Sequence, residues 1–385
     1  MRKIMLSAAA LMCGAVMIAQ FNTSDVDQQG NGNGSFVSQV GNHNDSDVDQ
    51  LGDLNGSIVN QHGTTNGSIV DQIGDENMSD VDQHGNTNAS FTGQKGEGND
   101  SNIEQHGKTN DADTYQGYYE GDIGNDNFSD VYQQGNSNTS LVYQVYASDR
   151  NDSYVYQKGH ANYSIMQQHG DDNYSTVDQD GHSNYSNVHQ VWDVGFNNSS
   201  VKQLGDFNDS WVWQEGTSNT SMVDQEGESN YSIVRQYGNY NGSVVTQFGF
   251  ENDSYVEQNG NGNGSLVTQN GNNNDSDVLQ NGNLNGSAVT QMGESNISDV
   301  YQSGTLNGSA VTQTGNNNTS DVDQNGFANL SCVDQDGFLH MSTVNQVGNF
   351  NFSCVDQNGN NHTSMVNQLG NSNSSFVTQN NGNPE

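Results

Sequence analysis

The chain has 385 residues, of which 30% are hydrophobic, and its mean hydropathy is −0.85. So few apolar side chains argue against conventional globular cores, and low hydropathy with a high net charge is also typical of disordered chains. Eight Lys and Arg residues against 46 Asp and Glu residues give a formal net charge of −38 at pH 7. This charge excludes a nucleic acid or an anionic membrane as the default partner and favours cations or basic surfaces.

The N-terminal stretch "MRKIMLSAAALMCGAVMIAQ" has the pattern of a secretory signal peptide. Arg2 and Lys3 precede an apolar run from about Ile4 to Ala19, which is too short for a membrane-spanning helix. We expect cleavage after Ala19, which divides the chain into a signal peptide over residues 1–19 and a single repeat domain over residues 20–385. No other segment is apolar enough to span a bilayer.

From residue 22 onward the chain repeats one phrase, NxSxVxQxGxx. Its glutamines stand eleven residues apart from Gln28 to Gln116 and again from Gln203 to Gln379, and the phrase occurs in 32 copies. Three longer intervals place insertions near residues 117–124, 145–150 and 191–196. Because these insertions fall after the glutamine, they lie in the predicted turns and leave the strands intact.

The spacing within the phrase predicts a strand rather than a helix. Ser, Val and Gln have the same parity, so in an extended chain they point to one face while the varying residues point to the other. We expect a strand of about seven residues, followed by a short turn in which Gly and Asn supply the positive φ of a tight corner. Two such arms make one coil.

The structural period is predicted to be 22 residues, because unusual residues recur at twice the short period. The pairs and triplets are His62, His84 and His106; His160 and His182; His340 and His362; Cys332 and Cys354; Asp277, Asp299 and Asp321. The sequence therefore predicts an all-β fold, a β-solenoid of about sixteen stacked 22-residue strand-turn-strand coils. At about 4.8 Å per layer the rod would be roughly 75–80 Å long.

Stacking decides which face is inside. A parallel in-register stack places each side chain over an equivalent one, so the invariant face has the least freedom and should be internal. We expect Val to fill a dry centre while Gln, Ser and Asn form hydrogen-bonded ladders along the axis. The variable face then meets solvent. The last copy of the phrase ends at Gln379 without a recognisable cap, so we expect both end strands to act as templates.

The phrase resembles the curlin repeat of bacterial curli fibre subunits over essentially all of residues 22–382, with an unusually large number of repeats. The resemblance implies a secreted bacterial protein that stacks as a β-solenoid and polymerises into extracellular amyloid fibres for biofilm matrix, surface adhesion and cell aggregation. It also implies a nucleator subunit and an outer-membrane secretion pore as partners. In one coil the resemblance assigns these ladder positions: Asn285, Ser287, Val289, Gln291, Gly293, Asn296, Ser298, Val300, Gln302 and Gly304.

Nothing in the repeat favours catalysis. Ser occupies an inward ladder site, whereas a nucleophile needs an oriented base in a cleft. We therefore predict that the protein is not an enzyme, and we assign no catalytic or cofactor-binding residue.

The outward acidic rows have two interpretations. Asp277, Asp299 and Asp321 would lie one above the next, closer than the Debye length of about 8 Å, and would repel one another at neutral pH. Ca²⁺ or another hard cation could bridge such a row, since carboxylate oxygens suit it. The alternative, which we favour, is a solvated acidic face that keeps the secreted chain soluble.

Two further sets of residues have alternative interpretations. The row His62, His84 and His106 could bind a transition metal or respond to pH, but tolerated turn residues are the favoured interpretation. Cys332 and Cys354 occupy stacked outward sites at a spacing that a disulfide accepts, so either a disulfide or two free thiols is open.

Aromatic residues cluster between Tyr115 and Trp213, around the three insertions. They could form an exposed patch that grips a surface or polysaccharide, or an outward stack that stabilises neighbouring coils. The alternative to a fibre subunit is a monomeric secreted β-solenoid that binds a ligand, such as an adhesin, ice-binding or Ca²⁺-binding rod. For ice binding the sequence offers one regular outward row: Thr246, Thr268, Thr290 and Thr312.

Overall fold

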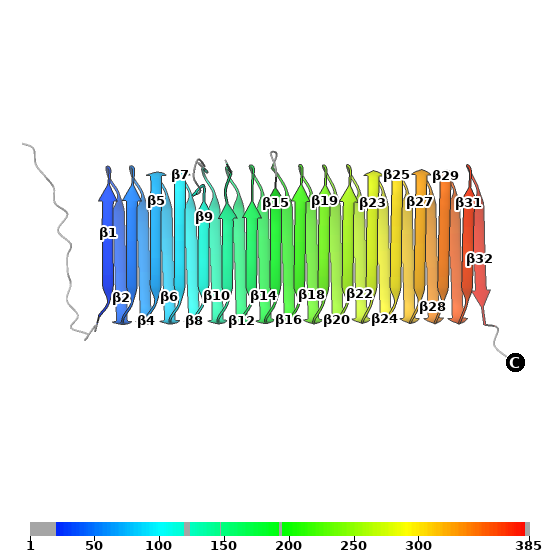
Figure 1. Cartoon of the computed structure of the whole chain (residues 1–385), viewed down its shortest axis with the longest axis horizontal. Coiled ribbons are helices and arrows are strands. Elements are labelled where there is room, and N and C mark those ends of the chain that lie inside the picture. The colour runs from blue at the N-terminus through cyan, green and yellow to red at the C-terminus, as the bar shows by residue number, and fades with distance from the viewer. Residues whose placement is uncertain (1–20, 119–123, 147, 192–194, 382–385) are drawn as a thin grey trace, which may run out of the picture.

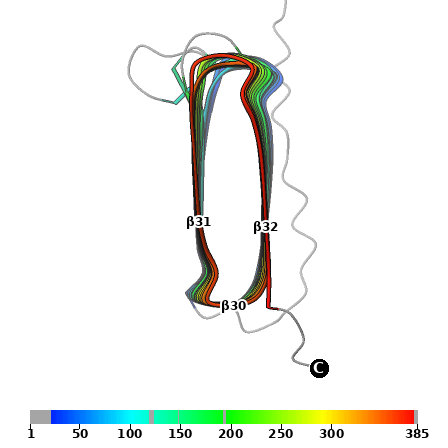
Figure 2. The same cartoon turned by 90° about the vertical axis from the view of Figure 1, so that its right-hand side faces the viewer.

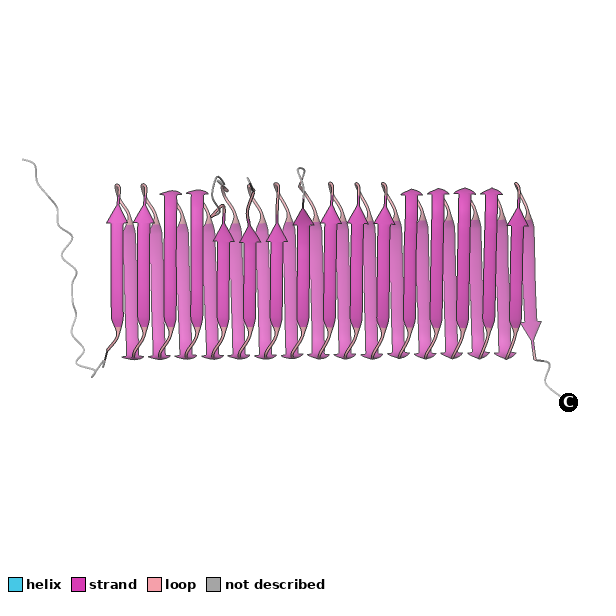
Figure 3. Ribbon diagram, viewed as in Figure 1, coloured by secondary structure: helices cyan, strands magenta, loops and turns pink. Residues whose placement is uncertain are grey.

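The computed structural model describes residues 21–118, 124–146, 148–191 and 195–381, and within these ranges its regular elements are all β-strands (Figure 3). The 32 strands form two sixteen-stranded parallel sheets. Odd-numbered strands form one sheet and even-numbered strands the other, so the chain crosses between the sheets after every strand (Figure 1). The predicted signal peptide, residues 1–19, lies outside the described residues.

The strands have similar lengths, from six to nine residues. The odd-numbered sheet contains β1 (Thr23–Gln29), β3 (Asp45–Leu51), β5 (Gly67–Asp75), β7 (Ala89–Glu97), β9 (Asp111–Gln116), β11 (Thr139–Gln144), β13 (Tyr163–Gln168), β15 (Tyr185–Val191), β17 (Asp209–Glu215), β19 (Tyr231–Tyr237), β21 (Asp253–Asn259), β23 (Asp275–Asn283), β25 (Ile297–Thr305), β27 (Thr319–Phe327), β29 (Met341–Asn349) and β31 (Thr363–Leu369). The even-numbered sheet contains β2 (Gly34–Asn42), β4 (Gly56–Thr64), β6 (Met78–Asn86), β8 (Asp100–Lys108), β10 (Phe128–Asn136), β12 (Asp152–His160), β14 (Tyr174–His182), β16 (Asn198–Asp206), β18 (Thr220–Glu228), β20 (Gly242–Phe250), β22 (Gly264–Asn272), β24 (Gly286–Glu294), β26 (Gly308–Asn316), β28 (Leu330–Phe338), β30 (Phe352–Asn360) and β32 (Ser374–Asn380).

Every pairing is parallel and in register, which confirms the predicted 22-residue coil. Between β23 and β25, for example, Val278 pairs with Val300 and Gln280 with Gln302. Viewed along the rod, the coils superpose into one flattened ring with the two sheets facing each other (Figure 2). Where the chain has extra residues the register still holds, because Gln105 of β8 pairs with Gln133 of β10 although 28 residues separate them.

The hydrophobic core is a row of valines between the two sheets. From Val48 to Val366 the residues at this site are at most 5% exposed, including Ile103 and Met166 where they replace Val. In strands such as β24 and β25 every second residue from Ser to Gln is buried, which follows the parity of the phrase. The invariant face is therefore internal, where side chains repeated in register fill the space between two sheets that hold equivalent residues at the same height.

The corners differ from the sequence-based expectation in two respects. Most strands have nine residues rather than about seven, because Gly and its successor remain paired, as Gly282 does with Gly304. The second difference concerns φ. Gly304 has φ +114°, but the left-handed residue of the next corner is Leu306 (φ 60°), not the Asn that follows it. Asn is committed to the internal ladder, so the residue before it absorbs the bend, although an L-residue in this conformation costs about 1–2 kcal/mol.

The three insertions occur at one edge of the rod. They lie between β9 and β10, between β11 and β12, and between β15 and β16, which are all connections from the odd-numbered to the even-numbered sheet. Parts of the predicted insertions, residues 119–123, 147 and 192–194, lie outside the described residues. The described flanks return the chain to the same corner of the ring (Figure 1).

Candidate functional site

The glutamines of the phrase form two unbroken hydrogen-bonded ladders, from Gln28 to Gln368 in one sheet and from Gln39 to Gln379 in the other. Gln269 Nε2 donates to Gln291 Oε1 at 2.9 Å, and Gln291 Nε2 donates to Gln313 Oε1 at 2.9 Å. The second hydrogen of Gln291 Nε2 goes to the carbonyl of Asp275, at 2.7 Å, on the first residue of β23 in the opposite sheet. Each ladder glutamine of this kind therefore joins successive coils and also joins the two sheets.

The asparagines of the phrase form a second type of ladder at the corners. The backbone N–H of Asn307 donates to Oδ1 of Asn285 at 3.0 Å, and Nδ2 of Asn285 donates to the carbonyl of Gly304 at 3.1 Å. Asn296 does the same at the other corner, accepting from the backbone of Asn318 at 3.1 Å and donating to the carbonyl of Gly315 at 2.8 Å. A side chain thus satisfies backbone groups that the turn leaves outside the sheet ladder.

The expected serine ladder is wrong for most coils. Ser287 and Ser298 are buried on the internal face, yet neither Oγ has a hydrogen-bond partner within the described part of the chain. Successive layers lie about 4.7–4.9 Å apart, which a short hydroxyl does not span, whereas the donor and acceptor arms of an amide do. Ser364 and Ser342 are an exception, with their oxygens 3.2 Å apart. The small size of serine, which lets the sheets approach, explains its place better than hydrogen bonding.

The repeat glycines are required by the neighbouring coil as well as by their own φ. A Cβ on Gly293 (φ +120°) would stand 2.1 Å from the carbonyl oxygen of Gly315, and one on Gly304 would stand 2.0 Å from that of Gly326. No side chain fits at these distances. The remaining assigned ladder residues, Val289 and Val300, are in the core with at most 2% exposure.

The row Asp277, Asp299 and Asp321 is present on the outer face of the odd-numbered sheet, where β23, β25 and β27 place the three residues in register. Burial, followed by repulsion from Asp277 and other neighbouring carboxylates, raises the pKa of Asp299 to about 6. Burial also raises the pKa of Asp277 and of Asp321. Within the described ranges no group of three or more His, Cys, Asp or Glu is arranged to hold a metal ion. Bridging of the row by Ca²⁺ stays a prediction.

The histidine row lies on strands rather than in turns, contrary to the favoured interpretation. His62, His84 and His106 belong to β4, β6 and β8, and the rings of the last two are stacked with centroids 5.1 Å apart. Nε2 of His84 lies 3.0 Å from a carboxylate oxygen of Asp82, and His106 contacts Glu104 in the same way. The nine-residue strands explain the difference, because they extend past the position that follows Gln.

His340 and His362 have a role that the sequence pattern did not reveal, because they replace asparagine in one corner ladder. His340 is 1% exposed; its backbone N–H donates to Oδ1 of Asn318, and its Nδ1 accepts the backbone N–H of His362 at 3.3 Å. Nε2 lies 3.2 Å from the carbonyl of Asp336, where an N–H donates. The imidazole therefore reproduces the backbone hydrogen bond that the asparagine side chain accepts, whereas its N–H bonds a carbonyl four residues earlier instead of the repeat-Gly carbonyl of the next coil. The spacing of the phrase could have revealed this substitution, because Asn318, Asn329 and His340 stand eleven residues apart.

Cys332 of β28 and Cys354 of β30 form a disulfide, with their Cα atoms 4.6 Å apart. The bond joins two successive coils on the outer face of the even-numbered sheet. It is the covalent counterpart of the hydrogen bonds that connect the other coils.

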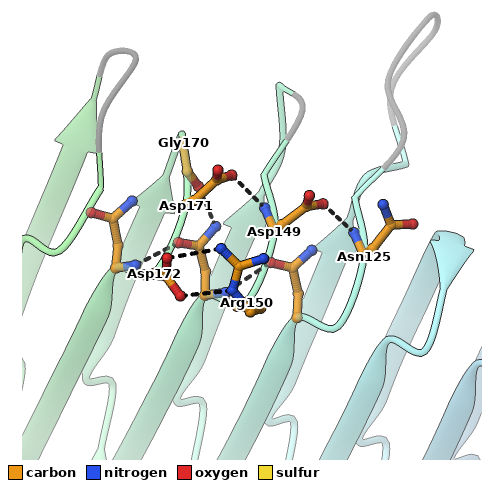
Figure 4. A network of polar contacts seen from close by, with 9 residues as sticks. Asn125, Asp149, Arg150, Gly170, Asp171 and Asp172 are labelled. Atoms are coloured by element: carbon orange, nitrogen blue, oxygen red, sulfur yellow. Dashed lines mark hydrogen bonds and ion pairs between the residues drawn. The ribbon is translucent and has the colours of Figure 1, made fainter.

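A third, external ladder runs along the edge that carries the insertions. The residue at this position, which in most coils follows the repeat Gly, accepts a backbone N–H from the preceding coil when it is Asp or Asn (Figure 4). The N–H of Asn125 donates to Asp149 Oδ1 at 2.9 Å, and that of Asp149 donates to Asp171 Oδ1 at 3.1 Å. Beside them Arg150 forms a two-pronged ion pair with Asp172, at 2.8 and 2.9 Å. Sequence reasoning missed this ladder because its position tolerates other residues.

The two ends of the rod are uncovered in the described structure. All seven residues of β1 are exposed, and Val26 is 42% exposed although it occupies a core position. At the other end, β32 alternates between exposed and half-buried residues. Because each glutamine donates to the next coil, the first coil presents glutamine acceptors and the last coil presents glutamine donors. The two ends are therefore complementary to each other.

In-register sheets, internal amide ladders and an 11-residue strand-turn repeat define a parallel β-solenoid repeat protein. The family model described as Curlin associated repeat matches residues 22–52, 55–85, 74–107, 124–159, 149–181, 216–249, 244–271, 293–326, 315–348 and 351–380. These matches cover more than half of the sequence, and the chain belongs to this family. The family and the fold are structural rather than catalytic. A comparison with curated proteins gives no match. Among the described residues no helix is long and apolar enough to span a membrane.

Proposed function

We propose that the protein is a secreted structural subunit that polymerises end to end into extracellular curli-like amyloid fibres for biofilm matrix, surface adhesion and cell aggregation. The observation that carries the proposal is the complementarity of the two open ends. Val26 and Gln28 of the first coil match Val366 and Gln368 of the last coil in type and in position within the strand. A second copy placed on the last coil would continue both sheets.

The energetic argument is that an open end leaves favourable contacts unmade. Gln368 Nε2 donates to the carbonyl of Phe352 at 2.8 Å, and its second hydrogen points along the ladder toward the position of a next coil. A row of unpaired strand N–H and C=O groups is a template for another chain. Each junction would bury core valines, complete the glutamine and asparagine ladders, and extend two sheets. Nothing limits such growth to one added copy.

Family membership supports the further partners of this proposal. A bacterial outer-membrane secretion pore would export the chain, and a nucleator subunit would present the first template at the cell surface. Ca²⁺ bridging of outward Asp rows would be an accessory stabilisation, since stacked carboxylates repel one another in its absence.

The test is assembly of the purified chain from residue 20 onward, followed by thioflavin T fluorescence, electron microscopy and fibre diffraction. We expect fibres with a meridional reflection at about 4.7–4.8 Å. The matched variants are Val377→Lys and Phe376→Lys, which add the same charge to β32 on opposite faces. An inward charge protects a sheet edge from pairing, so Val377→Lys should slow elongation at least tenfold, while Phe376→Lys, at a site 74% exposed, should elongate normally.

The alternative function is that of a monomeric ligand-binding rod. The threonine row that motivates it is in register on β20, β22, β24 and β26. Chains that remain single particles at high concentration, with no reflection near 4.8 Å, would overturn the fibre proposal and favour this function. Equal elongation of the two lysine variants would refute growth through the internal face.

A further inference from the structure

One segment of the rod has a surface chemistry of its own. All six Lys and Arg residues after the predicted signal peptide lie between Lys95 and Arg235, and all three tryptophans lie within the same stretch. Two of these, Trp211 and Trp213, are outward residues of β17, on either side of the buried Val212. Nothing in the fibre architecture requires them, because the ladders and the valine core use only the internal face.

These tryptophans line a groove in the outer face of the odd-numbered sheet, with a cavity volume of about 420 Å³. Two parallel rows of side chains from β15, β17 and β19 form its walls. Asn187, Trp211 and Ile233 form one row, and His189, Trp213 and Arg235 form the other.

The rings in the groove are held in place by their neighbours. His189 stacks on Trp213 with ring centroids 5.1 Å apart and an interplanar angle of 19°, and Tyr185 packs against Trp211 with centroids 5.4 Å apart. Trp211 is still 41% exposed, which leaves part of the indole available to a ligand. A rigid aromatic wall in a concave site suits a ligand with a flat apolar face.

Two polar atoms in the groove have no partner. Oδ1 of Asn187 and Nε1 of Trp213 are buried, and neither has a hydrogen-bond partner within the described ranges. Asn187 is 5% exposed, and its amide nitrogen is already used, since it donates to the Tyr185 hydroxyl at 3.4 Å. Both residues line the groove, so its wall contains one unpaired acceptor and one unpaired donor. A buried polar group without a partner costs about 1–3 kcal/mol, which a ligand that pairs with it recovers.

The two basic side chains of the groove, Arg235 and His189, are both engaged by neighbouring groups. The guanidinium of Arg235 lies over the ring of Tyr255, 5.6 Å from its centroid, and donates to the Tyr255 hydroxyl, which in turn donates to Glu257. Burial, and then the nearby His169, lowers the pKa of His189, so this imidazole is neutral at neutral pH. Arg235 is the charged residue of the groove wall, and its guanidinium is held by Tyr255, while the net charge of −38 repels anions.

We propose that this groove is a binding site for a neutral saccharide chain. A pyranose ring presents an apolar C–H face to the indole of Trp211, and its hydroxyls both donate and accept, so one sugar edge can pair with Asn187 Oδ1 and Trp213 Nε1. A purely aromatic or aliphatic ligand would leave both atoms unpaired. The site lies on the side of the rod and is independent of end-to-end assembly, so each subunit of a fibre would carry one copy.

The test is isothermal titration calorimetry of the folded full chain from residue 20, with cellopentaose and maltopentaose as neutral probes and a galacturonic acid pentamer as the anionic control. We expect saturable binding of a neutral probe and none of the anionic one. Trp211→Ala should weaken binding at least tenfold. Trp213→Phe keeps an aromatic ring at this position but removes the N–H, and should weaken binding about two- to tenfold, the effect of one net hydrogen bond.

The matched control is Tyr301→Ala, which removes an exposed aromatic from the same row as Trp213 but four coils away. It should leave binding unchanged. Circular dichroism of each variant checks that the β-structure is retained, which is expected because all substituted side chains point outward. Failure of both neutral probes to bind, tighter binding of the anionic probe, or equal affinity of wild type and Trp211→Ala would overturn the proposal. Fibre formation is scored separately, so the two proposals can fail independently.

Discussion

The strongest test of the ladder interpretation is the removal of one internal amide from the middle of the rod. Gln291 is fully buried in β24 and takes part in three hydrogen bonds: one accepted from Gln269, one donated to Gln313 and one donated to the carbonyl of Asp275. Gln291→Ala removes all three. Thr290→Ala, at the adjacent outward position of the same strand, removes none of them and is the matched control.

The expected magnitude follows from these contacts. Each hydrogen bond contributes about 0.5–1.5 kcal/mol net, so three bonds amount to roughly 1.5–4.5 kcal/mol. The amide of Gln269 keeps its bond to the carbonyl of Asp253, at 2.7 Å, which moderates the loss on that side. We therefore expect Gln291→Ala to cost about 3 kcal/mol of local stability, whereas an outward substitution such as Thr290→Ala stays within about 0.5 kcal/mol.

Hydrogen exchange followed by mass spectrometry is the suitable assay, because a repeat array opens locally rather than in one cooperative step. A loss of about 3 kcal/mol corresponds to a decrease in protection of about a hundredfold, since 1.4 kcal/mol is a factor of ten. The decrease should centre on peptides from β22 to β26. A second variant, Gln291→Met, fills the space without hydrogen bonds and separates bonding from cavity effects. Equal protection in Gln291→Ala and Thr290→Ala would refute the reasoning.

Three further predictions concern single positions. Gly304→Ala should lower local stability by roughly 2–5 kcal/mol, because the added Cβ would clash with the next coil and the φ of this residue is left-handed. Gly286→Ala, where an added Cβ has no heavy atom within 4 Å, should leave stability unchanged in the same exchange assay. The pKa of Asp299 is about 6 in the folded chain, against an ordinary value of 3.8, so the folded state binds the proton more tightly and stability should fall as pH rises from about 4 to 6. Asp299→Asn should make the stability measured by denaturant titration depend less steeply on pH. An unchanged dependence would contradict this prediction. His340→Ala should lower stability by about 1–3 kcal/mol, because it leaves the backbone N–H of His362 without an acceptor. His340→Asn should retain stability. Equal denaturation midpoints for the two variants would disprove the role of the imidazole in the ladder.

The fold could be predicted almost completely, because the positions that stay the same from copy to copy are those that pack inside the rod. The position of Val289 is Val in most copies and Ile, Met or Thr in the others, and because it has the same parity as Gln291 it identifies the inner face and the strand at once. The 22-residue period could also be predicted, since Ala288 pairs in register with Ala310 in one sheet and Asp277 pairs with Asp299 in the other.

Other details depend on lengths that a sequence pattern does not contain. Whether a polar residue that recurs in every copy forms a ladder depends on whether its side chain reaches from one coil to the next. The side chain of Gln291 does so and that of Ser287 does not. The left-handed corner residue is Leu306, an unremarkable side chain, because the corner uses the conformation of its backbone and not its chemistry. The proposal of a saccharide site depends on unpaired atoms of Asn187 and Trp213, which only the arrangement of three strands reveals.

The direction of the ladders decides how copies of the chain can join. Glutamine side chains donate from one coil to the next coil along the chain, as Gln291 does to Gln313, whereas in the asparagine ladder the next coil donates back, as Asn307 does to Asn285. These two hydrogen bonds therefore run in opposite senses between successive coils. Each end is nevertheless distinct: joining two N-terminal ends would place Gln28 acceptors against Gln28 acceptors, and joining two C-terminal ends would oppose donors. Head-to-tail contact alone satisfies both ladders at the junction, so the proposed fibre would grow with polarity, each added chain having the same orientation as the last.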